Sequence, residues 1–284
     1  MKTGFKIGDL ELTWLNGGTF ELDGGAMFGV VPKVLWQKKY PPSEDNYISL
    51  TAWPILVKTP QALVLIESGI GNKLTDKQRK IYRIKEDWSV LEDLNQLGIT
   101  REDIDFVVLT HYDFDHAGGV VMQDDGGNLS LTFPKARHII QKKEWDDVLK
   151  PNIRTVNTYW QVNIETMKNS SNLHLVDGTA EVVPGISVIF TGGHNGGHQI
   201  VTLESKSDKA LHLGDLLPTH AHANPLWIMA YDNYPMESIA LKEKWMKQGL
   251  AEGVWFTFYH DVFMTACKYD DKGNVTEKWP KERF

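Results

Sequence analysis

Four apolar runs in this 284-residue chain each lead within a few residues into histidine or aspartate. Val, Ile, Leu and aromatic residues dominate these runs, which is the composition expected of buried β-strands. The four junctions are Phe106–Thr110 before His111, Ile186–Phe190 before His194, Ala210–Leu213 before Asp215, and Val254–Phe258 before His260. Side chains placed just beyond rigid strands can converge in a cleft without disturbing the core. Convergence of imidazole and carboxylate groups suggests a metal site.

The densest junction is the segment His111–His116, which reads His-Tyr-Asp-Phe-Asp-His and offers four potential metal ligands within six residues. Packing such groups together costs free energy unless a cation neutralises them. A solvated acidic turn is the alternative explanation. The pair Gly118-Gly119 favours the metal site, because glycine lets the backbone turn tightly beside crowded side chains. Cys267 is the only cysteine, so imidazole and carboxylate groups would have to hold the metal.

The remaining sequence predicts a mixture of helices and strands in a single domain that spans residues 1–284. Strand-like apolar runs alternate with stretches of helical spacing at residues 88–97, 142–149, 158–168 and 235–248, the last ending at Gly249. No linker rich in Pro, Gly or Ser divides the chain, and a hydrophobic content of 42% can fill a sizeable core. This pattern is compatible with both α/β and α+β folds.

Charge and hydropathy limit the partners of the chain. A net charge of −7 disfavours nucleic acid and anionic membrane surfaces, because both need clustered Lys and Arg. No apolar window reaches the roughly 18 residues of a membrane span. The N-terminus also lacks the long apolar stretch of a secretory signal. We therefore expect a cytoplasmic protein that binds neither nucleic acid nor a membrane.

The metal-site segment resembles the motif of the metallo-β-lactamase superfamily, which usually reads His-x-His-x-Asp-His. Further segments are similar to family elements in the same order along the chain: Leu12–Gly18 to the opening strand, Leu65–Gly71 to the Asp-Thr-Gly segment, Thr191–His198 to Thr-Pro-Gly-His-x-x-Gly-His, Leu213–Asp215 to the bridging aspartate, and Phe258–Asp261 to the last ligand. This resemblance implies an α+β fold, the four-layer αββα sandwich with metals at one edge.

The resemblance also implies two divalent metal ions per chain. Seven residues match the ligand positions of the family: His111, Asp113 and His194 in site one, Asp115, His116 and His260 in site two, and Asp215 as the bridge. The mechanism of the family then implies that a hydroxide between the metals attacks an ester carbonyl. Asp215 or Asp115 would pass the proton to the leaving group, which makes these two carboxylates the candidate catalytic residues.

Asp113 departs from the family pattern, because most hydrolases of the family have histidine there. An aspartate adds negative charge and a hard oxygen ligand, which shifts the preference of site one from zinc toward manganese or iron. We expect zinc as the metal, with manganese or iron as competitors. The alternative is that Asp113 has disabled the site, leaving a non-catalytic metal-binding protein. Glu67 and His198 are candidates for orienting the ligands through hydrogen bonds, weighed against ordinary structural roles.

Two further segments, Asp23–Lys33 and Pro218–Trp227, are similar to the YtnP-type quorum-quenching lactonases, and Met229–Met236 continues the likeness. This narrower resemblance implies hydrolysis of a lactone ring, with N-acyl-homoserine lactones as the leading substrate class. A thioesterase, phosphotriesterase or other esterase stays open as the alternative, because such enzymes share the metals and differ in the pocket.

Candidates for substrate binding come from the same segments. Family lactonases often have a tyrosine three residues after the bridging aspartate, where this chain has Pro218. The candidates are His220, His222 and Tyr231 in the loop after Asp215, and Met27, Phe28 and Trp227 in apolar loops that could line an acyl-chain pocket. The alternative for the apolar loops is that they pack on each other or form a homodimer contact.

Overall fold

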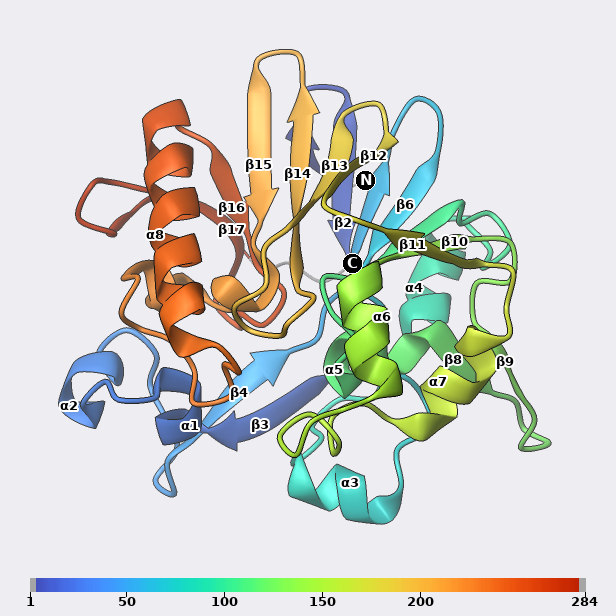
Figure 1. The fold of residues 1–284 in the computed structure, drawn as a ribbon. Coiled ribbons are helices and arrows are strands. Elements are labelled where there is room, and N and C mark those ends of the chain that lie inside the picture. The colour runs from blue at the N-terminus through green and yellow to red at the C-terminus, as the bar shows by residue number, and fades with distance from the viewer. Residues whose placement is uncertain (1–3, 281–284) are drawn as a thin grey trace.

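Two sheets of seven strands each run through the centre of the computed structural model, which describes residues 4–280 (Figure 1). The order in the first sheet is β1 (Phe5–Ile7), β2 (Leu10–Trp14), β5 (Ile55–Lys58), β6 (Leu63–Ile66), β7 (Phe106–Val108), β10 (Arg137–Gln141) and β11 (Leu173–Val176). The order in the second sheet is β12 (Thr179–Val183), β13 (Ile186–Phe190), β14 (Gln199–Ser205), β15 (Asp208–His212), β16 (Trp255–Thr257), β17 (Met264–Tyr269) and β18 (Val275–Pro280).

The two sheets pack on each other through a shared apolar core. Inward-facing side chains of both sheets meet there, for example Ile55 and Ile66 of the first sheet with Val188 and Val201 of the second. The residues of β2 alternate between buried and half-buried, whereas the first three of the four residues of β5 are buried. Near-continuous burial of β5 and β6 indicates that both faces of the first sheet are covered.

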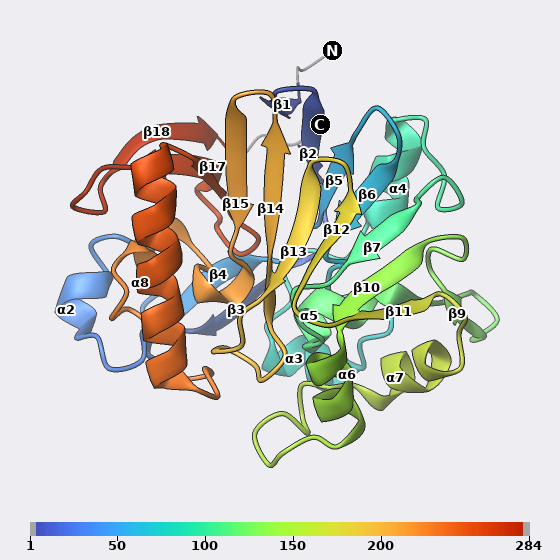
Figure 2. The same cartoon turned by 45° about the horizontal axis from the view of Figure 1, so that its top comes forward.

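Helices cover the outer face of each sheet (Figures 1 and 2). Apolar side chains of α4 (Val90–Gln96), α6 (Lys142–Leu149) and α7 (Gln161–Lys168) join Leu65 and Val107 of the first sheet in one core cluster. On the other side, Trp245 and Met246 of α8 (Pro235–Glu252) pack against Leu211 of the second sheet. The layers therefore run helix, sheet, sheet, helix, and the predicted four-layer αββα fold of the α+β class is confirmed.

A small two-stranded sheet lies at one edge of the sandwich, formed by β3 (Thr19–Asp23) and β4 (Tyr47–Thr51) (Figure 1). Together with α1 (Gly24–Phe28) and α2 (Lys33–Trp36) it builds a separate cluster of buried side chains. Further short elements are α3 (Asp76–Ile81), α5 (Phe114–Ala117), β8 (Val121–Gln123) and β9 (Leu129–Leu131), and the 3-10 turns η1 (Gly118–Val120), η2 (Gly214–Leu216) and η3 (His220–Ala223).

The last helix differs from its expected bounds. The sequence predicts an end at Gly249, but α8 continues to Glu252 and is capped by Gly253 in a left-handed conformation with φ of 64°. Gly249 is buried inside the helix, where an added Cβ would lie 2.5 Å from Cζ of Phe256. This glycine therefore permits close packing of α8 on β16 rather than ending the helix. Within residues 4–280, none of the helices is long and apolar enough to cross a membrane.

Candidate metal centre

Loops that follow four strands carry the expected ligands to one point between the two sheets. The segment after β7 provides His111 and Asp113 and continues into α5, and single residues follow β13, β15 and β16. Donor atoms lie within 4.8 Å of one another in three sets: His111, Asp113 and His194; Asp115, His116 and His260; and His111, His116 and Asp215. Asp113 is half-buried, and the other six side chains are buried. The structure thus brings together all seven residues.

Asp215 lies between the two groups of expected ligands. Its Oδ2 is 3.4 Å from Nε2 of His194 and 4.0 Å from Nε2 of His111. Its Oδ1 is 3.1 Å from Nε2 of His260 and 3.4 Å from Nε2 of His116. Each oxygen of one carboxylate therefore faces one group, which is the arrangement that a bridging ligand requires.

The other two carboxylates belong to one group each. Oδ2 of Asp113 is 3.5 Å from Nε2 of both His111 and His194. Oδ2 of Asp115 is 3.7 Å from Nε2 of His260, and it lies 3.9 Å from Nε2 of His116. The nitrogens and oxygens thus form two adjacent clusters that share Asp215.

Every imidazole in the centre has a partner at Nδ1, on the side away from the cluster. His194 is 2.9 Å from Oδ1 of Asp232, and His260 donates to the carbonyl of Thr51 at 2.7 Å. His111 Nδ1 is 3.0 Å from the hydroxyl of Thr110. His116 Nδ1 lies at ion-pair distance, 3.3 Å, from Oε1 of Glu67, without hydrogen-bond geometry. A partner that accepts the Nδ1 proton leaves Nε2 free to bind a metal, and it fixes the orientation of the ring.

The donor set fits divalent cations. Nε2 of His116 and Nε2 of His260 are 3.1 Å apart, so two lone pairs would face each other if both rings carry their proton on Nδ1. Among the described residues, buried Nε2 of His111, Oδ1 of Asp113 and Oδ1 of Asp215 have no hydrogen-bond partner. Buried polar atoms are rarely left in this way, and a cation would satisfy them. Imidazole nitrogen and carboxylate oxygen are ligands that zinc, manganese and iron accept.

The electrostatics without a metal show how protons compete for these atoms. Burial alone would raise the pKa of Asp215, but His116, His260 and His194 hold that pKa well below its ordinary value. Burial would lower the pKa of His116, yet Asp215, Glu67 and Asp115 raise it well above its ordinary value. The same carboxylate charges that favour a proton on His116 would favour a divalent cation.

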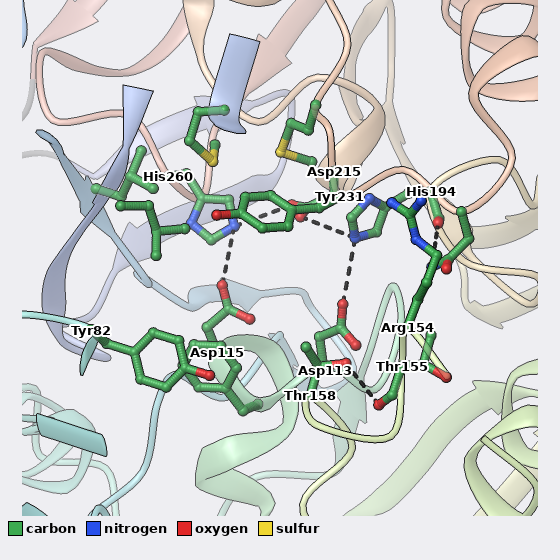
Figure 3. A pocket seen from close by; sticks show the side chains of 16 residues that line it. Tyr82, Asp113, Asp115, Arg154, Thr155, Thr158, His194, Asp215, Tyr231 and His260 are labelled. Carbon is green, nitrogen blue, oxygen red and sulfur yellow. Dashed lines mark hydrogen bonds and ion pairs between the residues drawn. The ribbon is translucent and has the colours of Figure 1, made fainter. Parts of the chain in front are cut away.

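A cavity of about 180 Å³ opens onto this centre (Figure 3). Its floor includes the ligand candidates Asp113, Asp115, His194, Asp215 and His260. Apolar and aromatic side chains make one part of the wall: Leu22, Met27, Leu50, Tyr82, Phe114, Met229 and Tyr231. Polar side chains make another part: Arg154, Thr155, Thr158 and Asn233. Such a mixture suits a small apolar ligand with a few polar groups.

Two of the six expected substrate-binding residues line this cavity, and they are Met27 and Tyr231. In the view of Figure 3, the Tyr231 ring lies between His260 and His194. Tyr82 lies on the opposite side beside Asp115. Burial, helped by Asp115 and Asp113, raises the pKa of Tyr82 to about 12. The phenol therefore stays protonated at neutral pH and can donate a hydrogen bond.

The structure places the other four expected substrate-binding residues elsewhere, outside the lining of this cavity. Phe28 stacks on Trp36 with ring centroids 4.8 Å apart and on His222 with centroids 4.4 Å apart, and its ring meets Trp227 edge-on. Nε2 of His222 lies 2.9 Å from the carbonyl of Met27, and burial lowers the pKa of His222 to about 3. Phe28, His222 and Trp227 thus pack together next to Met27, which lines the cavity.

His220, the fourth of these residues, is held by a carboxylate. Its Nδ1 lies 2.5 Å from Oδ2 of Asp261, and its backbone N–H donates to the same oxygen at 2.7 Å. The ring faces Tyr40 and Phe263 rather than the metal-ligand candidates. This pairing fixes the start of η3 and explains the histidine without a substrate.

Sequence reasoning missed several residues around the centre. One of them is Asp232, which lies in the segment that resembles the lactonases. A lone carboxylate in a largely apolar loop was the feature that could have identified it as a partner of a ligand candidate. Tyr82 and Arg154 had no such signal, because neither lies near a motif. Phe114 lies inside the motif, between two ligand candidates, but its place in the lining of the cavity was not predicted.

Comparison with known proteins agrees with this geometry. Residues 50–251 match the family model of the metallo-beta-lactamase superfamily. A probable metal-dependent hydrolase from Staphylococcus aureus has a solved structure that is 44% identical to this chain, with a TM-score of 0.93 over 99% of this chain and 100% of that one. Such similarity over the whole length covers every element that carries a ligand candidate.

More distant relatives include lactonases. An N-acyl homoserine lactonase of Bacillus cereus is 23% identical over 175 residues, which are 57% of this chain and 61% of that protein. The chain therefore spans about three fifths of the length of the curated lactonases that it matches. The dizinc quorum-quenching lactonase AidC, solved with a product, is 21% identical, with a TM-score of 0.78 over 99% of this chain and 97% of its own. The latter likeness concerns the fold.

The family model covers well over half of the chain, and six of the seven ligand candidates lie within the matched residues. The resemblance that the sequence suggested is thus confirmed, and the chain belongs to the metallo-β-lactamase superfamily.

Proposed function

We propose that this protein is a dinuclear metal-dependent hydrolase that opens the ring of N-acyl-homoserine lactones. The observation that carries the proposal is the position of Asp215 at the floor of the cavity, with one carboxylate oxygen toward each group of ligands. Site one would comprise His111, Asp113 and His194, and site two would comprise Asp115, His116 and His260. Zinc is the leading metal, and manganese or iron would compete through Asp113.

Two divalent cations in this centre would supply Lewis acidity toward an ester carbonyl and lower the pKa of water toward neutrality. The residues of the chain contribute the proton transfers. Asp115 and Asp215 both line the cavity, so a carboxylate oxygen of either can take the proton that the attacking water loses. The same oxygen can return that proton to the ring oxygen as the carbon–oxygen bond of the lactone breaks.

Tyr231 would position the substrate. Its ring lines the cavity beside the ligand candidates, and burial raises the pKa of its hydroxyl above the ordinary value. A protonated phenol can donate a hydrogen bond to the oxygen on which negative charge develops. Pro218 cannot do this, although it occupies the position where family lactonases often have tyrosine. Met27, Met229 and Phe114 would contact the acyl chain.

The proposal is tested by a hydrolysis panel with homoserine lactones of several acyl lengths, thioesters and phosphotriesters, using protein loaded with zinc, manganese or iron. We expect metal-dependent ring opening to be the fastest reaction. Tyr231→Phe should lower kcat about 100-fold with unchanged metal content, because one hydrogen-bond donor is lost. Tyr234→Phe is the matched control, since Tyr234 is 40% exposed, Tyr231 is 43% exposed, and only Tyr231 lines the cavity.

Two outcomes would overturn this assignment. The first is the absence of lactone opening with any of the three metals. The second is faster cleavage of thioesters or phosphotriesters than of every lactone in the panel, which would assign the centre to another hydrolase of the superfamily.

A further inference from the structure

Glu144 is a fully buried carboxylate in the first turn of α6, and it reaches two loops that carry ligand candidates. Oε1 accepts hydrogen bonds from the backbone N–H of Tyr112 at 2.9 Å and from the hydroxyl of Tyr159 at 2.9 Å. Oε2 accepts from the backbone N–H of Gly197 at 3.2 Å. Nδ2 of Asn195 adds a longer contact of 3.4 Å to Oε1. All four partners are donors, which suits an ionised carboxylate.

The two loops joined by Glu144 carry the ligands of one metal site. Tyr112 stands between His111 and Asp113 in the chain, and Asn195 directly follows His194. These three ligand candidates make up site one. In the described part of the chain, no hydrogen bond joins Glu144 to α5 or to the segment after β16, which carry the ligands of site two.

The backbone at Gly197 shows how closely the helix approaches the second loop. A Cβ on Gly197 would lie 2.0 Å from the backbone nitrogen of Glu144, so only glycine fits there. On its other side, the His194 loop is held by Asn233, whose backbone N–H donates to the carbonyl of His194 at 2.8 Å. The loop is thus fixed between two anchors, and Glu144 is the anchor that also holds the His111 loop.

We propose that Glu144 is a positioning residue for metal site one, setting the separation between the His111–Asp113 loop and the His194 loop. This inference rests on the dinuclear centre of the proposed function. A carboxylate has two acceptor oxygens and can bind both backbone N–H groups at once. Loss of one link would let the loops drift apart, and metal affinity depends steeply on such geometry.

The test is the metal affinity of Glu144→Gln. Glutamine keeps the size of the side chain but has one acceptor oxygen in place of two. If that oxygen stays on the N–H of Tyr112, its NH₂ faces the N–H of Gly197, and only the longer Asn195 contact still joins the His194 loop. We expect wild type to bind two Mn²⁺ ions per chain. The variant should bind one with unchanged affinity and the other about 10- to 100-fold more weakly. Spectroscopy gives a second readout, because magnetic coupling between paired Mn²⁺ ions should disappear at Mn²⁺ concentrations that saturate wild type.

Two controls separate positioning from general damage. Tyr159→Phe removes one donor to Oε1 and leaves both loop contacts, so it should keep both ions. Asp146→Asn changes an exposed carboxylate on the same helix, where it pairs with Lys142, and should also keep both ions. If Glu144→Gln fails to fold, Glu144→Asp keeps the charge but shortens the reach, and it should weaken the same single ion.

The outcomes distinguish this inference from the proposed function. Two ions bound with wild-type affinity by Glu144→Gln would overturn the inference alone, and so would equal weakening of both ions. Wild-type protein that binds fewer than two ions would overturn the dinuclear centre, and the inference with it.

Discussion

Residues behind the ligands determine how this centre presents its donor atoms. Glu67 is completely buried, and its backbone has a φ of 62°, in the left-handed region that costs a non-glycine residue about 1–2 kcal/mol. In that conformation its carboxylate lies 3.3 Å from Nδ1 of His116 and accepts a hydrogen bond from the backbone N–H of Thr110 at 3.2 Å. Backbone strain of this kind persists where the surrounding structure requires it, and here it places the carboxylate beside the ligand candidate His116.

Asp113 is the residue that should set the metal preference. Its Oδ2 lies 3.5 Å from two imidazole nitrogens, so the proposed site one would combine an anionic oxygen with two nitrogens. Asp113→His would replace this hard oxygen by imidazole. We expect the ratio of zinc to manganese bound from an equimolar mixture to rise roughly tenfold, as measured by elemental analysis.

Asp125→His is a control for this substitution, because it adds a histidine at an exposed position that does not line the cavity. An unchanged zinc-to-manganese ratio in Asp113→His would contradict the role given to Asp113. Loss of all bound metal would show that site one cannot accept a third imidazole.

The order of the sequence predicted which ligand candidates converge, but it did not predict which of the substrate-binding candidates line the cavity. The ligand candidates lie in segments that begin at strand ends, and strand ends are fixed by the sheet, so their convergence could be inferred from order along the chain. The environment of a loop histidine depends on residues that are distant in sequence. His220 meets Asp261, 41 residues later, and His222 meets the carbonyl of Met27, 195 residues earlier. No local pattern contains these pairings.

At the scale of elements, glycine has two structural roles in this chain that sequence spacing cannot distinguish. The helical spacing predicts that a helix ends at Gly249, but Gly249 lies inside α8 where the helix packs on Phe256, and Gly253 is the cap. In both places the sequence offers a glycine after a run of helical spacing. Only the tertiary contact distinguishes a glycine that allows packing from one that ends a helix.

The loop before β14 gives a test of this distinction. Gly193 has a φ of 88°, and an added Cβ would lie 3.1 Å from backbone atoms of Ser238 in α8. Gly253 has a φ of 64° and no atom within 4 Å of an added Cβ. We expect Gly253→Ala to lower the free energy of unfolding by about 1 kcal/mol, from backbone conformation alone. Gly193→Ala should cost more, about 2–3 kcal/mol, because α8 must also shift.

Urea denaturation of the two glycine variants measures this difference. Equal losses would show that the α8 contact adds nothing. Because His194 follows Gly193 directly, Gly193→Ala should also weaken metal binding, whereas Gly253→Ala should leave it unchanged.

In the whole molecule, each group of ligands takes donors from both sheets. His111 and Asp113 follow a strand of the first sheet, and His194 follows a strand of the second. Asp115 and His116 lie in α5, which follows the same strand of the first sheet, and His260 follows a strand of the second sheet. Metal ions in this centre would therefore link the two sheets and stabilise the folded chain by mass action. The fold and the site are coupled through the packing between the sheets.

At the scale of the whole molecule, His138, which lies outside the centre, should make the free energy of unfolding depend on pH. Burial lowers the pKa of His138, in β10, to about 4 from an ordinary value of 6.5. Between these two values the unfolded chain binds a proton at this residue and the folded chain does not. The contribution of His138 to the free energy of unfolding is therefore fully present above pH 6.5. It falls as the pH drops toward 4, at about 1.4 kcal/mol per pH unit. The total loss from His138 is about 3 kcal/mol.

His138→Leu removes this titration, so the variant should lose less stability than wild type between pH 6.5 and 4. Denaturation of chelator-treated protein at several pH values measures the slope, and protonation of the metal ligands then affects both proteins equally. Ile139→Leu is the matched control, because it changes packing on the same strand without a titrating group, and it should shift stability by a similar amount at every pH. Parallel curves for wild type and His138→Leu would mean that the folded chain accepts the proton at His138 as readily as the unfolded chain does.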